Sequence, residues 1–287
     1  MRRLKEFFIE KLILICGLAS IFFVALIFLF LLKEGLAVFS SVSPFAFLFG
    51  EKWYPISEPA RLGILPLILG SLLVTLGAAA ISVPIGIGCA IYIAEVAPAK
   101  IKEFLKAGIE LLAAIPSVVL GFIGMVTLVP WVKAVFKIPT GLTALSGSIM
   151  LAFMAMPTIV SIAEDALYAV PRSYKEGALA LGATRWQTIW RVMLPAGSSG
   201  ILAAVMLGIG RVIGETMAVM MITGNSAVIP QSILAPVRTL TATIAAEMGE
   251  AVVGSEHYFA LFAIGIVLFI MSFLINVTAD LFLHRNK

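Results

Sequence analysis

Residues 171–195 read PRSYKEGALALGATRWQTIWRVMLP, a polar stretch between long apolar runs of the chain. Ser173 and Glu176 have the capping-box spacing that begins a short helix. Gly182 suits the left-handed position that ends such a helix, and Thr184 is a residue type that caps the start of the next one. The pattern predicts two short helices joined at a glycine, which together form a projecting hairpin.

The second helix of this hairpin is expected to present Trp186, Ile189 and Trp190, and Pro195 marks the start of the next apolar run. Large apolar side chains on a projecting hairpin form a surface that a partner protein covers. The alternative is an amphipathic hairpin that lies on the membrane surface. These residues alone leave both interpretations open.

The composition of the whole chain indicates the class of protein. Of its 287 residues, 61% are hydrophobic and 13% are charged, whereas a soluble domain has about 25% charged residues. This excludes a soluble enzyme and a disordered chain, and it indicates several membrane-spanning helices. The net charge of +4 does not indicate nucleic-acid binding, because the basic residues stand in short groups between apolar runs.

Metal and cofactor chemistry is not expected. Cys16 and Cys89, the two cysteines, each lie in an apolar run, and the two histidines, His257 and His284, are far apart in sequence. Neither pair has the spacing of metal ligands or of a small disulfide framework. We therefore expect no metal and no cofactor.

Six membrane-spanning helices are expected, since a helix needs about 20 apolar residues to cross the hydrocarbon core. The expected spans are 12–32, 62–94, 111–132, 138–163, 195–222 and 257–279. The fifth includes Arg211 and Glu215, because the uncharged run after Glu215 contains two prolines and a polar cluster. The first is longer than the core of a secretory signal, about 7–15 residues, so we expect it to be retained.

The distribution of basic residues predicts the orientation, because cytoplasmic segments are rich in lysine and arginine. With the amino terminus inside, the inside segments hold thirteen basic residues, namely Arg2, Arg3, Lys5, Lys11, Lys100, Lys102, Lys106, Arg172, Lys175, Arg185, Arg191, Arg285 and Lys287. The outside segments hold six, namely Lys33, Lys52, Arg61, Lys133, Lys137 and Arg238. This favours a cell-membrane protein with both termini in the cytoplasm.

Residues 98–106, between the second and third spans, alternate lysines with apolar residues at helical spacing. Lys100, Lys102 and Lys106 are typical of a basic helix at a membrane surface. We expect this helix to contact anionic lipid headgroups.

Arg211 and Glu215 are four residues apart, so a continuous helix would place them on one face within reach of each other. Each costs about 2.5–3.5 kcal/mol inside a membrane, so both must face protein or water. A guanidinium suits oxyanions such as phosphate. Two hypotheses remain: Arg211 is a transient anion site held by Glu215, or the two residues form a structural ion pair.

Hydroxyl groups that could bind a passing anion occur at Ser117, in the third span, and at Thr216, beside Glu215. The hydroxyl of Thr75 and the side-chain amide of Asn225 are further hydrogen-bond donors. For such side chains, an ordinary contact between helices is the simpler interpretation.

A longer motif is formed by Glu176-Gly177-Ala178, then Gly182 and Ala183, then Leu194-Pro195. This motif resembles the EAA loop of ABC importer permeases. The resemblance implies that residues 171–195, with Trp186 among them, form a coupling helix that docks on a cytoplasmic ATPase. The family usually has alanine at the position of Gly177. Glycine there lowers the stability of the helix by about 1 kcal/mol relative to alanine. The sequence contains no Gly-x-x-x-x-Gly-Lys-Ser/Thr phosphate loop, so a separate chain would bind ATP.

Residues 210–219 read GRVIGETMAV, and this segment resembles the signature of Pst phosphate permeases. Residues 65–71, 84–88 and 115–122 agree with it, and the outer loop 33–61 is similar to that of the C-type subunit (PstC). The resemblance covers nearly the whole chain. Permeases for molybdate and sulfate share the EAA loop, so another oxyanion remains the alternative cargo.

The resemblance implies an all-α membrane protein with the type I ABC importer permease fold. Residues 1–61 would hold the first helix and a periplasmic loop, and residues 62–287 the permease core. The implied partners are two ATPase subunits, a homologous permease of the PstA type, a periplasmic or lipid-anchored phosphate-binding protein, inorganic phosphate and membrane lipids. The chain itself would be no enzyme.

The competing class of protein is an ion-coupled secondary carrier that works without an ATPase. Such carriers have inverted repeats and interrupted helices near the middle of the membrane. The sequence shows no internal similarity of this kind, and the hairpin would have no purpose in such a carrier. The last outer loop, 223–258, is expected to be a lid or a docking surface, with one helix over 238–248 and with Glu247 in water.

Overall fold

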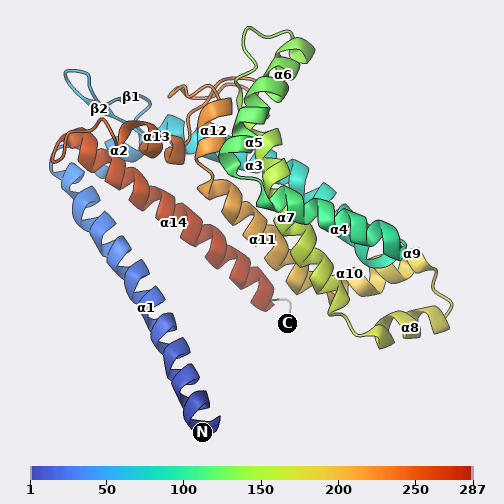
Figure 1. Ribbon diagram of the computed structural model, residues 1–287. Helices are drawn as coiled ribbons and strands as arrows, with labels where there is room; N and C mark the ends of the chain where they lie inside the picture. Colours follow the sequence, from blue (N-terminus) through green and yellow to red (C-terminus); the bar gives the residue numbers. More distant parts are fainter. Residues whose placement is uncertain (1, 286–287) are drawn as a thin grey trace.

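The computed structural model describes the backbone of residues 2–285, with side chains at position 7, positions 9–278 and position 281. This part of the chain is helical apart from its loops and one two-stranded sheet (Figure 1). In that sheet β1 (Trp53–Tyr54) and β2 (Arg61–Leu62) pair antiparallel, with Trp53 opposite Leu62.

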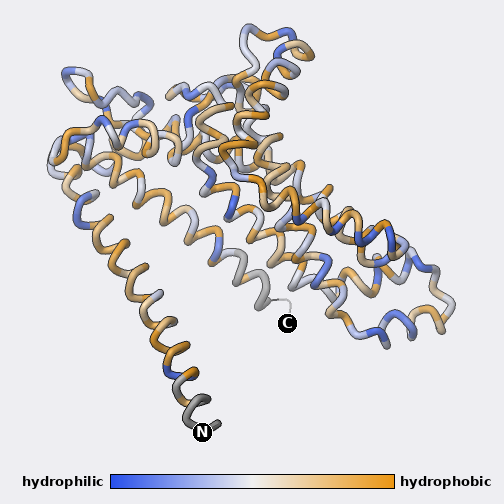
Figure 2. The backbone as a smooth tube through the Cα atoms, in the orientation of Figure 1, coloured by the Kyte–Doolittle hydropathy of each residue, from blue (hydrophilic) through white to orange (hydrophobic). Residues whose placement is uncertain are grey.

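Five helical segments of the described chain are long and apolar enough to cross a membrane. They are Ile9–Ser40, Leu65–Val96, Ser117–Phe136, Ala144–Tyr168 and Glu256–Thr278, and Figure 2 shows apolar residues along them. A sixth crossing is formed if the bent pair Arg185–Ala196 and Ser198–Gly214, whose axes differ by 72°, counts as one span. The protein is therefore an all-α, multi-pass membrane protein, as expected.

The centre of the fold is built from α3 (Leu65–Ile91), α7 (Ala144–Tyr168) and α11 (Ser198–Gly214), with α7 packed against both of the others. Small residues allow the close packing. A Cβ at Gly208 of α11 would lie 2.5 Å from the side chain of Ile159, which is fully buried in α7. Close packing of this kind, with a small residue of one helix against a side chain of the next, is one of the sources of helix association inside a membrane.

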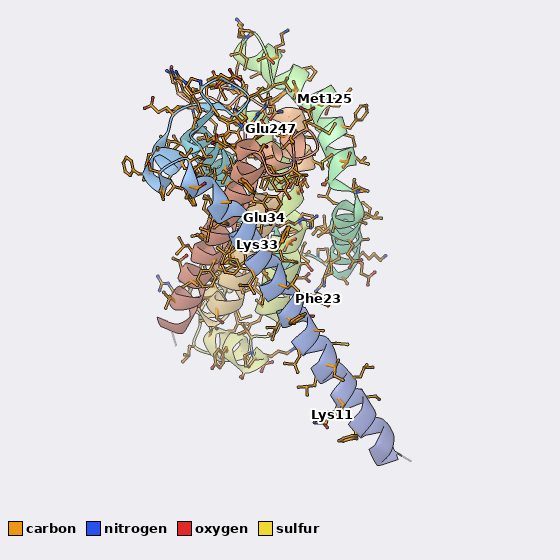
Figure 3. All side chains as sticks on the ribbon, turned by 90° about the vertical axis from the view of Figure 1, so that its left-hand side faces the viewer. Lys11, Phe23, Lys33, Glu34, Met125 and Glu247 are labelled. Carbon is orange, nitrogen blue, oxygen red and sulfur yellow. The ribbon has the colours of Figure 1, made fainter. Side chains whose placement is uncertain are left out.

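The first and last helices, α1 (Arg2–Leu36) and α14 (Glu256–Arg285), meet near the carboxyl end of α1. A Cβ at Gly35 would lie 2.9 Å from a backbone nitrogen of α14, and the rings of Phe28 and Phe269 have centroids 4.6 Å apart. Toward its amino terminus α1 diverges from the other helices, which Figures 1 and 3 show from two sides.

The third span differs from the expected helix over 111–132, because the chain breaks at Ile115–Pro116. The basic helix is the start of α4 (Ala99–Ala114), which continues to this break. A proline disfavours helical backbone in the residue before it, and Ile115 is extended. The chain then resumes as α5 (Ser117–Ile123) and passes through a π-helical turn into α6 (Val129–Phe136).

The fifth span also differs from the expected single helix over 195–222. α10 (Leu194–Ala196) is followed by a sharp bend at Gly197, after which α11 begins. α11 ends before Glu215–Thr216, and α12 (Met217–Ile222) follows these two residues. Two of the described spans are thus interrupted, one at Pro116 and the other at Gly197 and again at Glu215–Thr216.

Short elements gather at the two ends of the long helices (Figure 1). At one end lie η1 (Ala37–Ser40), α2 (Pro44–Phe49), the sheet and α13 (Leu240–Glu247). At the other end lie α8 (Arg172–Ala180) and α9 (Arg185–Thr188), on the same side as the start of α1 and the end of α14.

Candidate functional site

The predicted hairpin is present, and its glycine turn is confirmed. Gly182 has φ +84°, and its N–H donates to the carbonyl of Leu179 while the N–H of Ala183 donates to the carbonyl of Ala178. These two bonds are those of a Schellman motif, which satisfies the last carbonyls of α8. The expected cap at Ser173 is wrong. Pro171 holds the N-cap position without a side-chain bond, so Ser173 lies inside the first turn.

The cap of the second helix is confirmed at Thr184. Its hydroxyl accepts from the backbone N–H of Gln187 at 3.2 Å, and the side chain of Gln187 accepts from the N–H of Thr184 at 2.9 Å. This reciprocal pair is a capping box. From α9 the chain runs through a π-helical segment, η4 (Ile189–Met193), into α10. The end of α8 and the start of α9 are therefore both fixed by hydrogen bonds within the hairpin itself.

The hairpin exposes apolar side chains. Leu181 is 91% exposed, Trp186 61% and Trp190 52%, and the two indole rings lie edge to face with centroids 5.7 Å apart. Glu176 and Gly177 are exposed beside them, and Ala178 and Ala183 are half-buried under the turn. The expected coupling residues are thus gathered on one projecting element, on which Leu181 and the two tryptophans are not covered by the chain itself. The expectation that Ile189 is presented beside them is wrong, because Ile189 is 5% exposed and packs in a buried cluster with Ile91 of α3.

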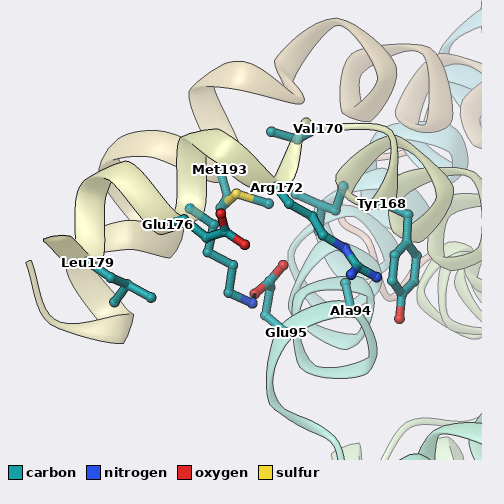
Figure 4. Close-up of a pocket in the computed structure, with 10 residues that line it drawn as sticks. Ala94, Glu95, Tyr168, Val170, Arg172, Glu176, Leu179 and Met193 are labelled. Carbon is teal, nitrogen blue, oxygen red and sulfur yellow. Dashed lines mark hydrogen bonds and ion pairs between the residues drawn. The ribbon is translucent and has the colours of Figure 1, made fainter.

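A cavity of about 340 Å³ lies between α8 and the end of α3, and an ion pair between Lys175 and Glu95 lies in it (Figure 4). Glu95 belongs to η2 (Tyr92–Val96), a π-helical extension of α3, and its side chain is 8% exposed. Arg172 and Tyr168 also line the cavity. Glu95 is not among the site residues predicted from the sequence, although an acidic residue directly after a long apolar run is a visible signal.

The lysines of α4 contact protein. The carboxylate of Glu164 on α7 is 1% exposed, and the ammonium groups of Lys106 and Lys102 lie 3.0 and 3.5 Å from its oxygens. The ammonium of Lys102 also lies 3.7 Å from the ring centroid of Tyr168. A buried carboxylate requires such partners. The expected lipid contact therefore does not describe Lys102 and Lys106, whereas Lys100 is exposed.

The expected pairing of Arg211 with Glu215 is wrong in this structure. Among the ion pairs of the described residues, none joins them, because α11 ends between the two and Glu215 has extended backbone. The Glu215 carboxylate instead accepts from the N–H of Ala218 at 3.2 Å, and Thr241 donates to the Glu215 carbonyl at 2.9 Å. The break is thus held by groups from α12 and α13.

Arg211 lies on an uncovered face of α11. The side chain is exposed, and one guanidinium N–H lies 3.5 Å from the hydroxyl of Thr158 on α7. No atom lies within 4 Å of a Cβ built at Gly210 or Gly214 on either side of it. An arginine that has a single long contact retains most of its five donors for another ligand. Thr158 is not among the site residues predicted from the sequence, because its partner Arg211 is 53 positions away.

Ser117 and Thr216 stand at the two helix interruptions. Ser117 is the first residue of α5, and Thr216 is the N-cap residue of α12, where its hydroxyl donates to the carbonyl of Gly214 at 3.1 Å. α5 and α12 pack side by side in parallel, since Gly121 meets Ala218 and Gly124 meets Ile222. Ser117 lies one turn before Gly121, and the break at Glu215–Thr216 lies just before Ala218. The start of α5 and the break are therefore at the same height along the two packed helices.

A second polar group, the outer cluster, consists of Trp53, Arg238, Glu247 and His257. The Glu247 carboxylate accepts from the Trp53 indole N–H at 3.0 Å, lies 2.8 Å from Nε2 of His257 and pairs with Arg238. Arg238 also donates to the side chain of Asn225 at 2.9 Å. The expectation that Glu247 is solvated is therefore wrong, and the expected helix over 238–248 is limited to α13. The cluster borders a cavity of about 400 Å³.

Side chains suited to metals do not come together in the described part of the chain. No group of three or more His, Cys, Asp or Glu residues there is placed to hold a metal ion. Cys16 and Cys89 are free and exposed.

Comparisons with known proteins place these features in context. Residues 82–287 match the family model described as "binding-protein-dependent transport system inner membrane component". The probable ABC transporter permease protein YqgH of Bacillus subtilis is 42% identical over 100% of this chain and 93% of its own length. The phosphate transport system permease protein PstC of Mesorhizobium japonicum is 36% identical, over 84% of this chain and 79% of its own. A similar fold is found in the crystal structure of a bacterial alginate ABC transporter in complex with an alginate pentasaccharide-bound periplasmic protein. One chain of that structure aligns with a TM-score of 0.65 and 17% identity, over 94% of this chain and 93% of its own length.

Proposed function

The chain belongs to the family of binding-protein-dependent transport system inner membrane components and is a permease of the PstC type, and from this premise we propose that it imports inorganic phosphate. It forms one half of a pore and uses ATP hydrolysed by a partner chain. The observation that supports an anionic cargo most directly is the exposed guanidinium of Arg211, one turn before the helix break. Relatives named as phosphate permeases support the choice of phosphate.

At Arg211 the proposed role is transient binding of the anion. A guanidinium presents a planar fork of N–H donors that matches the oxygens of phosphate. Because the Glu215 carboxylate accepts from the N–H of Ala218, it forms no ion pair with Arg211 in this conformation. The hydroxyl of Ser117, at the same level, is the proposed further donor, and the hydroxyl of Thr216 would have to release the carbonyl of Gly214 before it could donate to the anion. A single cation with few hydroxyl donors binds an anion without holding it tightly, as release requires.

The proposed coupling site is the hairpin 171–195. Its exposed tryptophans and Leu181 form a compact apolar surface that fits a groove on an ATPase subunit. We propose two such ATPase subunits, one under this chain and one under a homologous permease of the PstA type. Because the start of α1, the end of α14 and the hairpin lie on one side, all three would then be cytoplasmic.

The proposed contact with the partner permease involves α1. Its residues between 9 and 27 are almost all exposed, and Lys11 lies where α1 extends clear of the other helices in Figure 3. A membrane helix that diverges from its own bundle leaves an apolar face for lipid or for a second subunit. On this proposal residues 1–61 add α1 and the outer loop to a permease core over 62–287.

On the opposite side we propose that a phosphate-binding protein docks beside the outer cluster. The cavity there is bordered by residues 53–57, and Ile56 at the tip of the sheet is 84% exposed. A fixed polar cluster beneath an exposed apolar tip has the composition of a docking surface, an apolar anchor with a polar rim.

The secondary-carrier alternative is tested by transport without an ATPase. Interrupted helices, which such carriers have, occur here at Ile115–Pro116 and at Glu215–Thr216, so this feature does not separate the two classes. If the purified chain alone moved phosphate into liposomes with no ATPase present, the proposed coupling to ATP would be wrong.

Cargo and the role of Arg211 are tested together by uptake of labelled phosphate into liposomes that contain the complete complex. We expect an excess of unlabelled phosphate to compete and sulfate and molybdate to leave uptake unchanged. Arg211→Gln should lower uptake about tenfold or more, because it removes charged hydrogen bonds worth about 1.5–3 kcal/mol. Arg211→Lys should lower it less. Lys133→Gln, which removes an exposed cation of α6, is the control. Wild-type uptake by both Arg211 variants would refute the site.

A further inference from the structure

The contacts at the two ends of α3 lead us to propose that this helix connects the hairpin to the break at Glu215–Thr216, with Glu95 and Thr241 as positioning residues. The inference rests on the proposed function, since it concerns how ATP-driven movement of the hairpin reaches the residues beside Arg211. Neither residue contacts the cargo on this account. Each acts through the position of a neighbouring element.

At the inner end, α8 has one link to α7 and one polar link to the end of α3. The first is the chain itself, since Ala169–Pro171 joins α7 to α8. The second is the ion pair of Lys175 with Glu95, the one ion pair or side-chain hydrogen bond between α8 and α3 in the described residues. Glu95 is nearly buried and stands between two cavities. Apolar residues of the hairpin also reach α3, since Ile189 and Met193 of η4 lie in one buried cluster with Ile91 of α3. Movement of the hairpin therefore acts on the end of α3 through this apolar cluster and through the ion pair, which is the polar link from α8.

The π-helical segment η2 helps to place Glu95. In η2 the N–H of Ala97 donates to the carbonyl of Tyr92, five residues earlier, at 2.8 Å. A π-helical turn rotates the residues after it relative to a regular α-helix, and such turns are frequent at functional sites. Local backbone geometry thus sets the direction in which the end of α3 presents its carboxylate.

At the outer end, α3 contacts the first residues of α13. The hydroxyl of Ser71 accepts from the N–H of Leu240 at 2.9 Å, and a Cβ at Gly70 would lie 2.5 Å from the carbonyl oxygen of Arg238. The next residue, Thr241, donates to the carbonyl of Glu215 at 2.9 Å. A shift of the outer end of α3 therefore moves α13, and α13 is bonded directly to the break.

Between these ends α3 is long and closely packed. Its 27 residues span about 40 Å. Ser148 of α7 donates to the carbonyl of Val74, and Ile159 of α7 lies against Gly86. α3 and α7 therefore move together as one packed pair. The ion pair at Glu95 connects the hairpin to α3 and, through this packing, to α7. Packed helices transmit displacement because they do not compress.

The test measures labelled phosphate imported per ATP hydrolysed by the complete complex in liposomes. We expect Glu95→Gln to lower this ratio about fivefold or more while ATP hydrolysis and co-purification with the ATPase continue. Exchanging the two charges, with Glu95→Lys and Lys175→Glu in one chain, should restore at least half of the ratio. Glu103→Gln, which removes an exposed carboxylate of α4, is the matched control. A wild-type ratio in Glu95→Gln would overturn the inference.

A second measurement separates connection through α3 from a local effect at the hairpin. Thr241→Val alone should also lower the ratio, and the chain with both Glu95→Gln and Thr241→Val should be no worse than the poorer single variant. Residues that act through one element are not additive. Two losses that multiply would refute the connection. If the wild-type complex imports no phosphate at all, the proposed function fails, which is a different result from either of these.

Discussion

The hairpin and the outer cluster, at opposite ends of the long helices, are constructed in opposite ways. In the hairpin the caps join residues a few positions apart, as between Thr184 and Gln187, and its tryptophans and Leu181 face outward. In the outer cluster, Trp53 and Glu247 are 194 positions apart, and the polar groups are enclosed. The difference indicates that the hairpin keeps its shape while a partner covers it, whereas the outer cluster fixes loops from distant parts of the chain to one another.

The largest expected effect is at the turn of the hairpin. Gly182→Val places a β-branched residue at φ +84°, which costs about 1–2 kcal/mol or more and distorts the turn. We expect the ATPase to be lost from the purified complex. Gly108→Ala, at an exposed helical glycine of α4 with open space around its Cβ, should retain it. Full retention of the ATPase by Gly182→Val would show that the hairpin does not need this shape.

An intermediate effect is expected in the outer cluster. Glu247→Ala leaves Trp53, Arg238 and His257 without their shared acceptor. We expect a loss of about 2–3 kcal/mol in the free energy of unfolding of the outer layer, measured by thermal unfolding and by protease cleavage of residues 51–60 in detergent. Glu250→Ala, beside it and exposed, should cost less than about 0.5 kcal/mol. Equal losses of unfolding free energy in the two variants would mean that the Glu247 carboxylate is exposed to solvent.

The smallest expected effect is at the cap of α9. Thr184→Ala removes a single capping bond and should cost about 1 kcal/mol of helix stability. We expect ATPase affinity to fall about fivefold, since a fivefold change corresponds to about 1 kcal/mol. Thr184→Ser keeps the hydroxyl and should restore the affinity. An alanine variant that binds as the wild type does would show that tertiary packing, and not the cap, holds the hairpin.

The contrast between local and distant bonds also explains what the sequence predicts. Gly182 and Thr184 are predictable, because their partners are nearby in sequence. The cap at Ser173 fails because Pro171 already occupies the start of α8. The break at Glu215 has no local signal, since its carbonyl is taken by Thr241, 26 positions later. The ion pair of Glu95 and the enclosure of Glu247 are not predictable for the same reason, because most of their partners come from other parts of the fold.

On the proposed function, an ATPase that binds the hairpin drives this permease. The most direct measurement is ATP-dependent accumulation of labelled phosphate by liposomes with the complete complex, comparing the wild-type chain with one in which residues 176–191 are replaced by a flexible linker. We predict accumulation in the first case only and none without ATP. Undiminished import by the complex without its hairpin would contradict the account.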